Sequence, residues 1–255
     1  MIKIENFEVL GWDHVIRGMR NPMNSWDKSD SGICKGGDDG VGCDNCADCG
    51  CDHTYDHSWQ LGKADHELMM KLAKAGSVHG KFRRMIAVYV DITAPLYWWK
   101  EFDTYKVGTV ANSCSTMHKI HAKEFTWEDF SVEHLTNFGM WGEQFTDADA
   151  VYAPAKTMGC IISALNGARD RYLDIKSRGT QWEHQAKQAW WQMIQLLPSS
   201  YNQKRTVMLN YEVLSGIYMY RKNHKLDEWR EFCQWIERLP YSEIIMCNAK
   251  GDELK

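Results

Sequence analysis

Hydrophobic and polar positions follow two different periods along the chain, and each change of period marks a predicted element. The chain begins in short alternation, and the segment 82–93 carries apolar side chains at every second position: Ile86, Val88, Val90 and Ile92. That spacing predicts a half-buried strand. The period is helical over 65–76 and again after Pro95, so one helix is predicted before the strand and one after it.

The C-terminal half has helical spacing almost throughout. Gly179, Pro198 and Pro240 separate the predicted helices, which cover 147–178, 181–197, 206–222 and 227–239. A strand region followed by several long helices predicts an α+β fold, in which a small mixed or antiparallel sheet is wrapped by helices. Nothing in the linkers requires a second domain, so we expect a single domain over 1–255.

Composition narrows the class of protein. The chain has 255 residues, 44% of them hydrophobic, which is enough to bury a sizeable core. Its net charge of −4 argues against a generally basic nucleic-acid coat, and we expect no nucleic-acid partner. No apolar run approaches the roughly 20 residues of a membrane span, and the N-terminus lacks a signal-peptide core. We therefore expect a soluble cytoplasmic protein without a membrane partner.

A Gly/Asp/Cys-rich segment over 29–57 is the densest chemical signal, and it has no apolar periodicity. The spacing Cys-x2-Cys-x2-Cys-x-Cys places four thiols within reach of one tetrahedral ion, as structural zinc requires: Cys43, Cys46, Cys49 and Cys51. An iron–sulfur cluster and free thiols in an acidic loop are the alternatives. The cysteine number is odd, nine, and no secretory signal is present, which favours reduced or metal-bound thiols over disulfides.

The order of elements over 72–118 is distinctive. A helix and the letters Ser-Val-His-Gly-Lys-Phe-Arg-Arg precede the strand, and Ala-Pro then leads into Trp-Trp-Lys-Glu-Phe-Asp-Thr-Tyr-Lys and Asn-Ser-Cys-Ser-Thr. A second run, over 196–230, contains Leu-Pro followed by Thr206, Asn210, Leu214, Tyr220-Arg221 and Glu228-Trp229-Arg230. Both runs resemble the flavin-dependent thymidylate synthase family. There, Gln-x-x-Arg-His-Arg-x-x-Ser-x-Asn-Glu-x-Ser-x-Arg-Tyr follows the strand, and Leu-Pro, Asn-x-Arg-x-Leu and Leu-Arg follow later.

The resemblance implies a fold, a reaction and an assembly. The family forms homotetramers whose flavin and nucleotide sites lie between subunits. Its members methylate the C5 position of the pyrimidine deoxynucleotide dUMP to give dTMP. Reduced FAD supplies the hydride, with methylenetetrahydrofolate and NADPH as cosubstrates. We therefore expect a flavoprotein of nucleotide biosynthesis that binds a pyrimidine deoxynucleotide.

The resemblance also assigns candidate residues, several with changed chemistry. Thr104-Tyr105-Lys106 stands at the family's Arg-His-Arg, Glu101 at its Gln and Cys114 at its second Ser. The implied catalytic residues are Glu101, Tyr105, Lys106 and Cys114. The implied cofactor-binding residues are His79, Arg83, Arg84, Thr104, Lys106 and Asn210. The implied substrate-binding residues are Glu101, Ser115, Arg221 and Arg230.

Two chemical details leave alternatives open. If Cys114 lies on a helix, His118 shares its face and the two make a thiolate–imidazole pair; the other interpretation is a small buried thiol. The aromatic run at Tyr97, Trp98, Trp99 and Tyr105 either lines a flavin slot or fills a helical core. Three functions remain: a divergent thymidylate synthase, a relative acting on another pyrimidine nucleotide, and a non-catalytic nucleotide-binding or zinc-stapled interaction protein.

Overall fold

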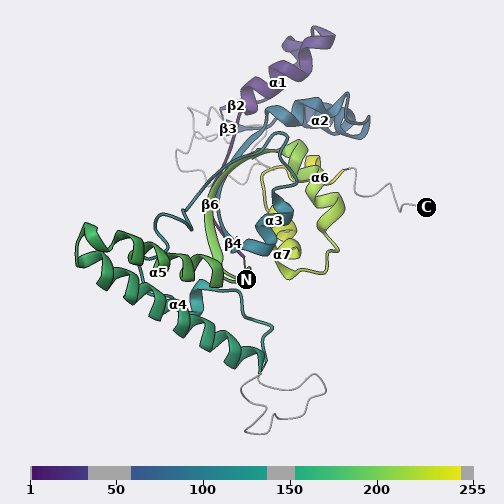
Figure 1. Cartoon of the computed structure of the whole chain (residues 1–255). Coiled ribbons are helices and arrows are strands. Elements are labelled where there is room, and N and C mark those ends of the chain that lie inside the picture. Colours follow the sequence, from purple (N-terminus) through teal and green to yellow (C-terminus); the bar gives the residue numbers. More distant parts are fainter. Residues whose placement is uncertain (1, 34–58, 137–152, 248–255) are drawn as a thin grey trace, which may run out of the picture.

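The computed structural model of the chain describes residues 2–33, 59–136 and 153–247 (Figure 1). Its centre is a four-stranded sheet in the order β1-β4-β6-β5, with strands Lys3–Leu10, Ala87–Pro95, Asn202–Asn210 and Val110–Ser113. Every neighbouring pair is antiparallel. The α+β class and the antiparallel sheet wrapped by helices are therefore confirmed.

The predicted strand is confirmed with shifted bounds. Residues Gly80–Met85 form a short 3-10 helix, and β4 begins at Ala87. The predicted apolar face is buried, since Ile86, Val88, Val90 and Ile92 are all at most 1% exposed. Alternation therefore identified the inward face correctly, because successive side chains of a strand point to opposite sides.

One predicted helix is wrong over its first turn. The helix expected over 206–222 begins at Tyr211 as α6 (Tyr211–Arg221), and the preceding residues form β6. Thr206, Asn210 and Leu214 are four residues apart, which mimics a helical face. Pairing of β6 between β4 and β5 is the reason for the strand, and Val207 and Leu209 are buried at its inner face.

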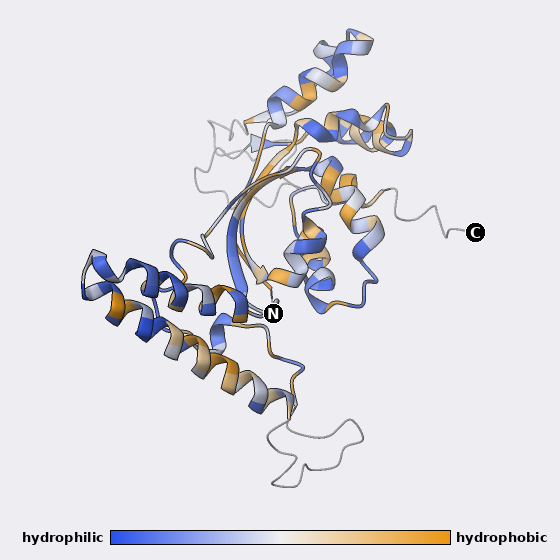
Figure 2. Ribbon diagram, viewed as in Figure 1, coloured by the Kyte–Doolittle hydropathy of each residue, from blue (hydrophilic) through white to orange (hydrophobic). Residues whose placement is uncertain are grey.

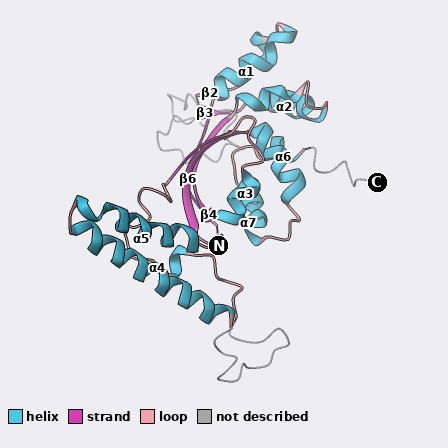
Figure 3. Cartoon of the chain, in the orientation of Figure 1, coloured by secondary structure: helices cyan, strands magenta, loops and turns pink. Residues whose placement is uncertain are grey.

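Helices α3 (Leu96–Phe102), α6 and α7 (Asp227–Glu237) lie on the concave side of the curved sheet (Figures 1 and 3). The core between them is aromatic: Trp98 contacts Trp229 at a centroid distance of 4.7 Å and Phe232 at 5.6 Å. Short α8 (Glu243–Met246) packs against α6. Hydrophobic colouring is strong where these helices face the sheet (Figure 2).

The long helices α4 (Pro154–Ser177) and α5 (Glu183–Leu196) form a hairpin that projects from the sheet (Figure 1). The predicted helices over 147–178 and 181–197 are confirmed within the described residues. A second, smaller core holds the hairpin to the segment 120–130 through Ile120, Phe125, Phe130, Leu165 and Met193. Among the described helices, none combines the length and apolar character needed to cross a membrane.

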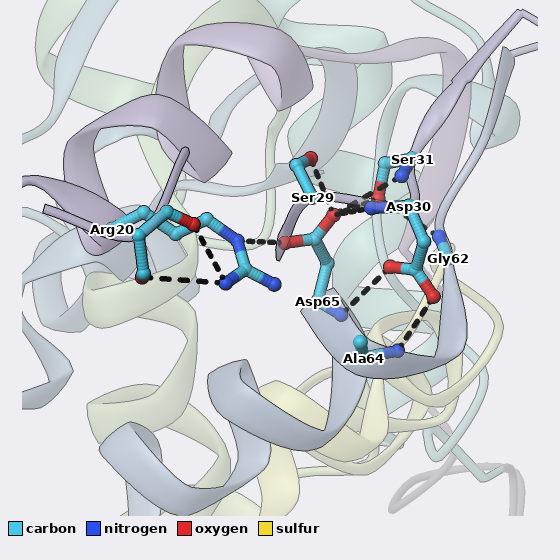
Figure 4. A network of polar contacts seen from close by, with 8 residues as sticks. Arg20, Ser29, Asp30, Ser31, Gly62, Ala64 and Asp65 are labelled. Carbon is cyan, nitrogen blue, oxygen red and sulfur yellow. Dashed lines mark hydrogen bonds and ion pairs between the residues drawn. The ribbon is translucent and has the colours of Figure 1, made fainter. Parts of the chain in front are cut away.

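At the other end of the sheet, α1 (Trp12–Arg20) and α2 (Lys63–Lys74) are joined by a polar network centred on the buried ion pair of Arg20 and Asp65 (Figure 4). Asp65, fully buried, accepts hydrogen bonds from Arg20 Nε at 2.6 Å and from the hydroxyls of Ser29 and Ser31. Asp30 in turn accepts from the backbone N–H groups of Ala64 and Asp65 at the first turn of α2. The network fixes residues 29–31, at the start of the Gly/Asp/Cys-rich segment, to the first turn of α2, which follows that segment, beside the short pair β2 (Gly32–Ile33) and β3 (Trp59–Gln60).

Candidate active site

Three of the predicted site residues meet where α3 ends beside α6. The guanidinium of Arg221, at the last turn of α6, donates from Nη1 to Glu101 Oε2 at 2.8 Å. Its Nε donates to the Tyr105 hydroxyl at 3.0 Å. Glu101 and Tyr105 are four residues apart and follow one another along α3 and its C-terminal turn, so both reach the same arginine. The resemblance had assigned all three to the site.

Two further residues complete this cluster, and neither was assigned a role from the sequence. Trp229, at the start of α7, donates from its indole N–H to the same Glu101 oxygen at 2.9 Å. The Arg221 guanidinium lies over the Trp229 ring, 4.8 Å from its centroid. His224 Nε2 lies 3.0 Å from Arg221 Nη1 and 3.6 Å from Glu101 Oε2. Trp229 adjoins the matched Arg230, a position that could have suggested it; His224 carries no such signal.

We name Glu101, Tyr105, Arg221, His224 and Trp229 the Glu101–Arg221 cluster. Trp229 is fully buried, whereas the Glu101 and Arg221 side chains are 36% and 20% exposed. Trp229 therefore lies beneath the cluster, on the side of the protein core, and the Glu101–Arg221 ion pair faces solvent. The backbone N–H of Leu226 donates to His224 Nδ1 at 3.2 Å, which holds the imidazole ring beside the ion pair.

Arg230 stabilises the turn beside this cluster. Its guanidinium donates from Nη1 to the carbonyls of His224 and Lys225, at 2.9 and 3.2 Å, and from Nη2 to the Asp227 carboxylate. These bonds close the turn between α6 and α7 that carries His224. Arg230 remains half exposed, with a side-chain exposure of 45%. Its predicted contact with a nucleotide stays a prediction.

The predicted cofactor residue Arg83 is engaged within the fold. Its side chain is 2% exposed and forms an ion pair with Glu212 at 2.7 Å. Arg83 Nη1 also donates to Ser215 and to the carbonyl of Ile244. Glu212 stands at the arginine position of the family's Asn-x-Arg-x-Leu motif. A phosphate could reach Arg83 only after this pair was broken, whereas neighbouring Arg84 and His79 are exposed.

The predicted cofactor residue Asn210 caps a helix. Its side-chain oxygen accepts from the N–H of Val213 at 3.0 Å, at the N-terminus of α6. Thr104 is exposed and donates its hydroxyl to the carbonyl of Glu101 at 2.7 Å. Lys106 is exposed in the turn that follows. Of the charged candidates for a flavin phosphate, Arg84 and Lys106 are thus the ones that face solvent.

Cys114 and His118 do not share a helix face, so that expectation is wrong. Residues Val110–Ser113 form β5, and Cys114 continues from it with its N–H bonded to the carbonyl of Lys204. The Ser115 hydroxyl accepts from the N–H groups of Met117 and His118, which makes a turn. Pairing with β6 replaces the helix because the chain here forms the edge of the sheet. Cys114 is an exposed free thiol, which also excludes a buried one.

The aromatic run divides between core and surface. Trp98 and Trp99 are 0% and 1% exposed and pack into the core, so neither lines a flavin slot. Tyr97 and Tyr105 are half-buried. Helical geometry explains the division, because adjacent helix positions point in directions about 100° apart and only one side of α3 faces solvent.

Cys43, Cys46, Cys49 and Cys51 lie outside the described residues, so the zinc site stays a prediction. Within the described ranges, no group of three or more His, Cys, Asp or Glu side chains has an arrangement that could hold a metal ion. If the four thiols bind zinc, elemental analysis of the purified protein is expected to find about one zinc per chain. A chelator would then remove the metal without unfolding the sheet, which is built from other segments. Metal-free protein with four titratable thiols would contradict the site.

No protein-family profile and no curated protein sequence matches the chain. Among solved structures, thymidylate synthase X (ThyX) from Helicobacter pylori with FAD and dUMP matches 98% of this chain and 100% of its own, with a TM-score of 0.57 and 14% identity. A second structure, of flavin-dependent thymidylate synthase ThyX from Helicobacter pylori complexed with FAD and dUMP, matches 95% of each chain, with a TM-score of 0.54 and 14% identity. The chain therefore has a ThyX-like fold over nearly its whole length.

Proposed function

We propose that this protein is a divergent flavin-dependent thymidylate synthase, which methylates dUMP to dTMP with reduced FAD and methylenetetrahydrofolate and draws on NADPH. The observation that carries the proposal is the Glu101–Arg221 cluster. It brings together three residues assigned independently from two separated motifs, on a fold shared with a protein solved with FAD and dUMP.

The cluster offers a pyrimidine edge both kinds of partner it needs. Uracil presents an N3–H donor between two carbonyl acceptors, and a carboxylate beside a guanidinium supplies an acceptor and donors in reach of each other. Glu101 would accept from N3–H, and Arg221 would donate to a neighbouring carbonyl. His224 and Tyr105 would orient Arg221, and the partly exposed Tyr105 ring offers a surface for the base. These residues would bind and polarise the base.

The exposed positive charges among the candidate residues meet part of what a flavin needs. A flavin pyrophosphate needs cationic donors, and exposed Arg84 and Lys106 have that chemistry, whereas Arg83 is committed to Glu212. Arg84 and Lys106 would hold the pyrophosphate, and Tyr105 would contact the ring system. When bound, reduced flavin supplies the hydride for this class of methylation. We also propose the family's homotetramer, in which a second subunit would complete the solvent-facing side of the cluster.

The carboxylate at residue 101 also suits a second pyrimidine base, cytosine. A carboxylate can accept a hydrogen bond from the cytosine amino group, whereas the amide of glutamine offers uracil both an acceptor and a donor. A relative that acts on a cytosine nucleotide is therefore the alternative function. Substitution of residue 101 should therefore distinguish a uracil nucleotide from a cytosine nucleotide as the substrate.

Equilibrium titration of the wild-type protein and of Glu101→Gln with dUMP and dCMP tests the assignment. We expect the wild type to bind dUMP at least as tightly as dCMP. In Glu101→Gln the affinity for dCMP should fall about tenfold, because the amide has one acceptor oxygen for the cytosine amino group where the carboxylate has two. Its affinity for dUMP should stay unchanged. A wild type that strongly prefers dCMP would favour the alternative function. If the wild type and Glu101→Gln bound dCMP with the same affinity, Glu101 would not belong to the base site.

A further inference from the structure

An open groove of about 440 Å³ runs along the side of α3 that faces the connection between α5 and β6. Its walls combine an apolar part with charged groups: Leu96, Tyr97, Lys100, Asp103, Leu197 and Arg205 are among its lining residues. The volume lies in the range of sites for small organic ligands, roughly 300–1,000 Å³. Glu101 and Arg221 do not line it, so the groove is a separate feature from the Glu101–Arg221 cluster.

Arg205 is held rigidly at the wall of the groove. Its guanidinium stacks on the buried Trp99, 4.2 Å from the ring centroid. Nε donates to Gln203 Oε1 at 3.0 Å, and Nη1 donates to Asp103 Oδ1 at 2.8 Å. Among the described residues, Nη2 has no hydrogen-bond partner. The side chain is only 15% exposed, so a ligand would meet a preformed donor with little remaining rotamer freedom.

Lys100 adds a second cation at the same wall. It is exposed on α3, and within the described part of the chain its ammonium group forms no ion pair. Tyr97 contributes mainly its ring, because its hydroxyl donates to the buried Glu228. Burial and that carboxylate both raise the pKa of Tyr97, which keeps the hydroxyl protonated. Against Lys100 and Arg205 stands one carboxylate, Asp103, so the groove has a surplus of positive charge.

We infer that this groove binds a phosphate monoester: Arg205 Nη2 and the Lys100 ammonium hold the phosphate, and Leu96, Leu197 and the Tyr97 ring contact the organic part. A fixed guanidinium donor beside a mobile ammonium suits phosphate oxygens. Asp103 orients Arg205 and at the same time weakens the attraction for an anion. If the proposed function holds, the bound group is the 5′-phosphate of the nucleotide, and only that identification rests on the proposed function.

Because Lys100 and Asp103 carry opposite charges, neutralising each of them should change the phosphate affinity in opposite directions. Lys100→Gln is expected to weaken binding of dUMP and of inorganic phosphate about fivefold. Asp103→Asn keeps an oxygen for Arg205 but removes the repulsion, so it should strengthen both about threefold. The matched control is Lys74→Gln, an exposed lysine on α2 outside the groove, which should change neither affinity. Calorimetric titration measures all three, and thermal melting confirms that each variant is folded.

Deoxyuridine, which lacks the phosphate, is the discriminating ligand. Its affinity should not respond to Lys100→Gln or Asp103→Asn. Tighter binding of dUMP than of inorganic phosphate would support an ester ligand, whereas equal binding would contradict the contacts assigned to the organic part. Absence of phosphate binding in the wild type, or variants without opposite shifts, would overturn the inference.

Failure of the proposed function has a different signature. In that case Glu101→Gln would leave the affinities for both dUMP and dCMP unchanged. The affinity for inorganic phosphate would still fall in Lys100→Gln. Conversely, a nucleotide site that depends on Glu101 but is indifferent to Lys100 and Asp103 would refute the groove and leave the proposed function standing.

Discussion

Replacing Asp65 by alanine is expected to lower the free energy of unfolding by about 3–5 kcal/mol, the cost of removing one partner from a buried ion pair. Arg20 is only 4% exposed, and its Nε would lose the carboxylate that lies 2.6 Å away. Ser29, Ser31 and the N–H of Asp30 would lose their acceptor as well (Figure 4). Arg20 would thus be left as an unpaired charge in the interior, whereas Ser29 and Asp30 are exposed and can bond to water instead.

The pH dependence of Asp65 has a definite sign. Burial alone raises the pKa of this carboxyl group, but hydrogen bonds from Ser31, Ser29 and Arg20 lower it below its ordinary 3.8. A depressed folded-state pKa contributes stability that is present above the unfolded value and is lost as pH falls below it. We therefore expect wild-type stability to decline as pH falls below about 3.8, with a smaller decline in Asp65→Asn.

Chemical denaturation of Asp65→Ala, Asp65→Asn and the control Asp170→Ala checks this prediction. Asp170 is an exposed residue of α4 whose pair with Arg169 faces solvent, so its loss should cost less than about 1 kcal/mol. Asp65→Asn keeps the shape and one acceptor oxygen and should fall between the other two. A cost for Asp65→Ala no larger than that of Asp170→Ala would show that the network does not hold α1 to α2.

The second large effect concerns ligand binding. Arg221→Ala is expected to weaken dUMP binding roughly 30-fold, about 2 kcal/mol, as for truncation of a charged hydrogen-bonding partner. The variant removes the donor proposed for a base carbonyl and leaves Glu101 Oε2 with the Trp229 indole at 2.9 Å and His224 Nε2 at 3.6 Å. Tyr105 also loses its contact with the guanidinium. Both halves of the proposed base site would therefore change together.

Titration of Arg221→Ala, with Arg171→Ala as control, measures this effect. Arg171 is exposed on α4, and among the described residues it has no side-chain partner, so its removal changes net charge by the same amount without touching the cluster. Arg221→Lys should recover only part of the affinity, because an ammonium group cannot donate to Glu101, Tyr105 and a ligand in the same planar geometry. Equal affinities of Arg221→Ala and Arg171→Ala for dUMP would place the nucleotide elsewhere.

Much of the fold could be predicted where local pattern and tertiary environment agree. The alternation of β4 coincides with a buried face, and α4, α5 and α7 have clear helical periods. Strand β6 could not be predicted in the same way. Its residues also fit a helical spacing, and only the neighbouring strands β4 and β5, distant in sequence, decide between the two.

The candidate site shows the same division. Glu101, Tyr105 and Arg221 were found because each stands at a motif position, and the structure brings them together. The engagement of Arg83 could not be found this way, because its partner Glu212 lies far along the chain and the motif has arginine there. Which charge stays free for a ligand depends on long-range packing, and a motif does not encode that packing.

The most direct test of the proposed enzyme is the visible absorption spectrum of the purified protein, recorded with FAD before and after dUMP is added. We expect FAD to bind and its bands to shift with dUMP, because the two sites would adjoin through Tyr105. In that case the assay for conversion of dUMP to dTMP follows. Protein that binds no flavin, with or without dUMP, would contradict a flavin-dependent enzyme and leave a ThyX-like fold used for another purpose.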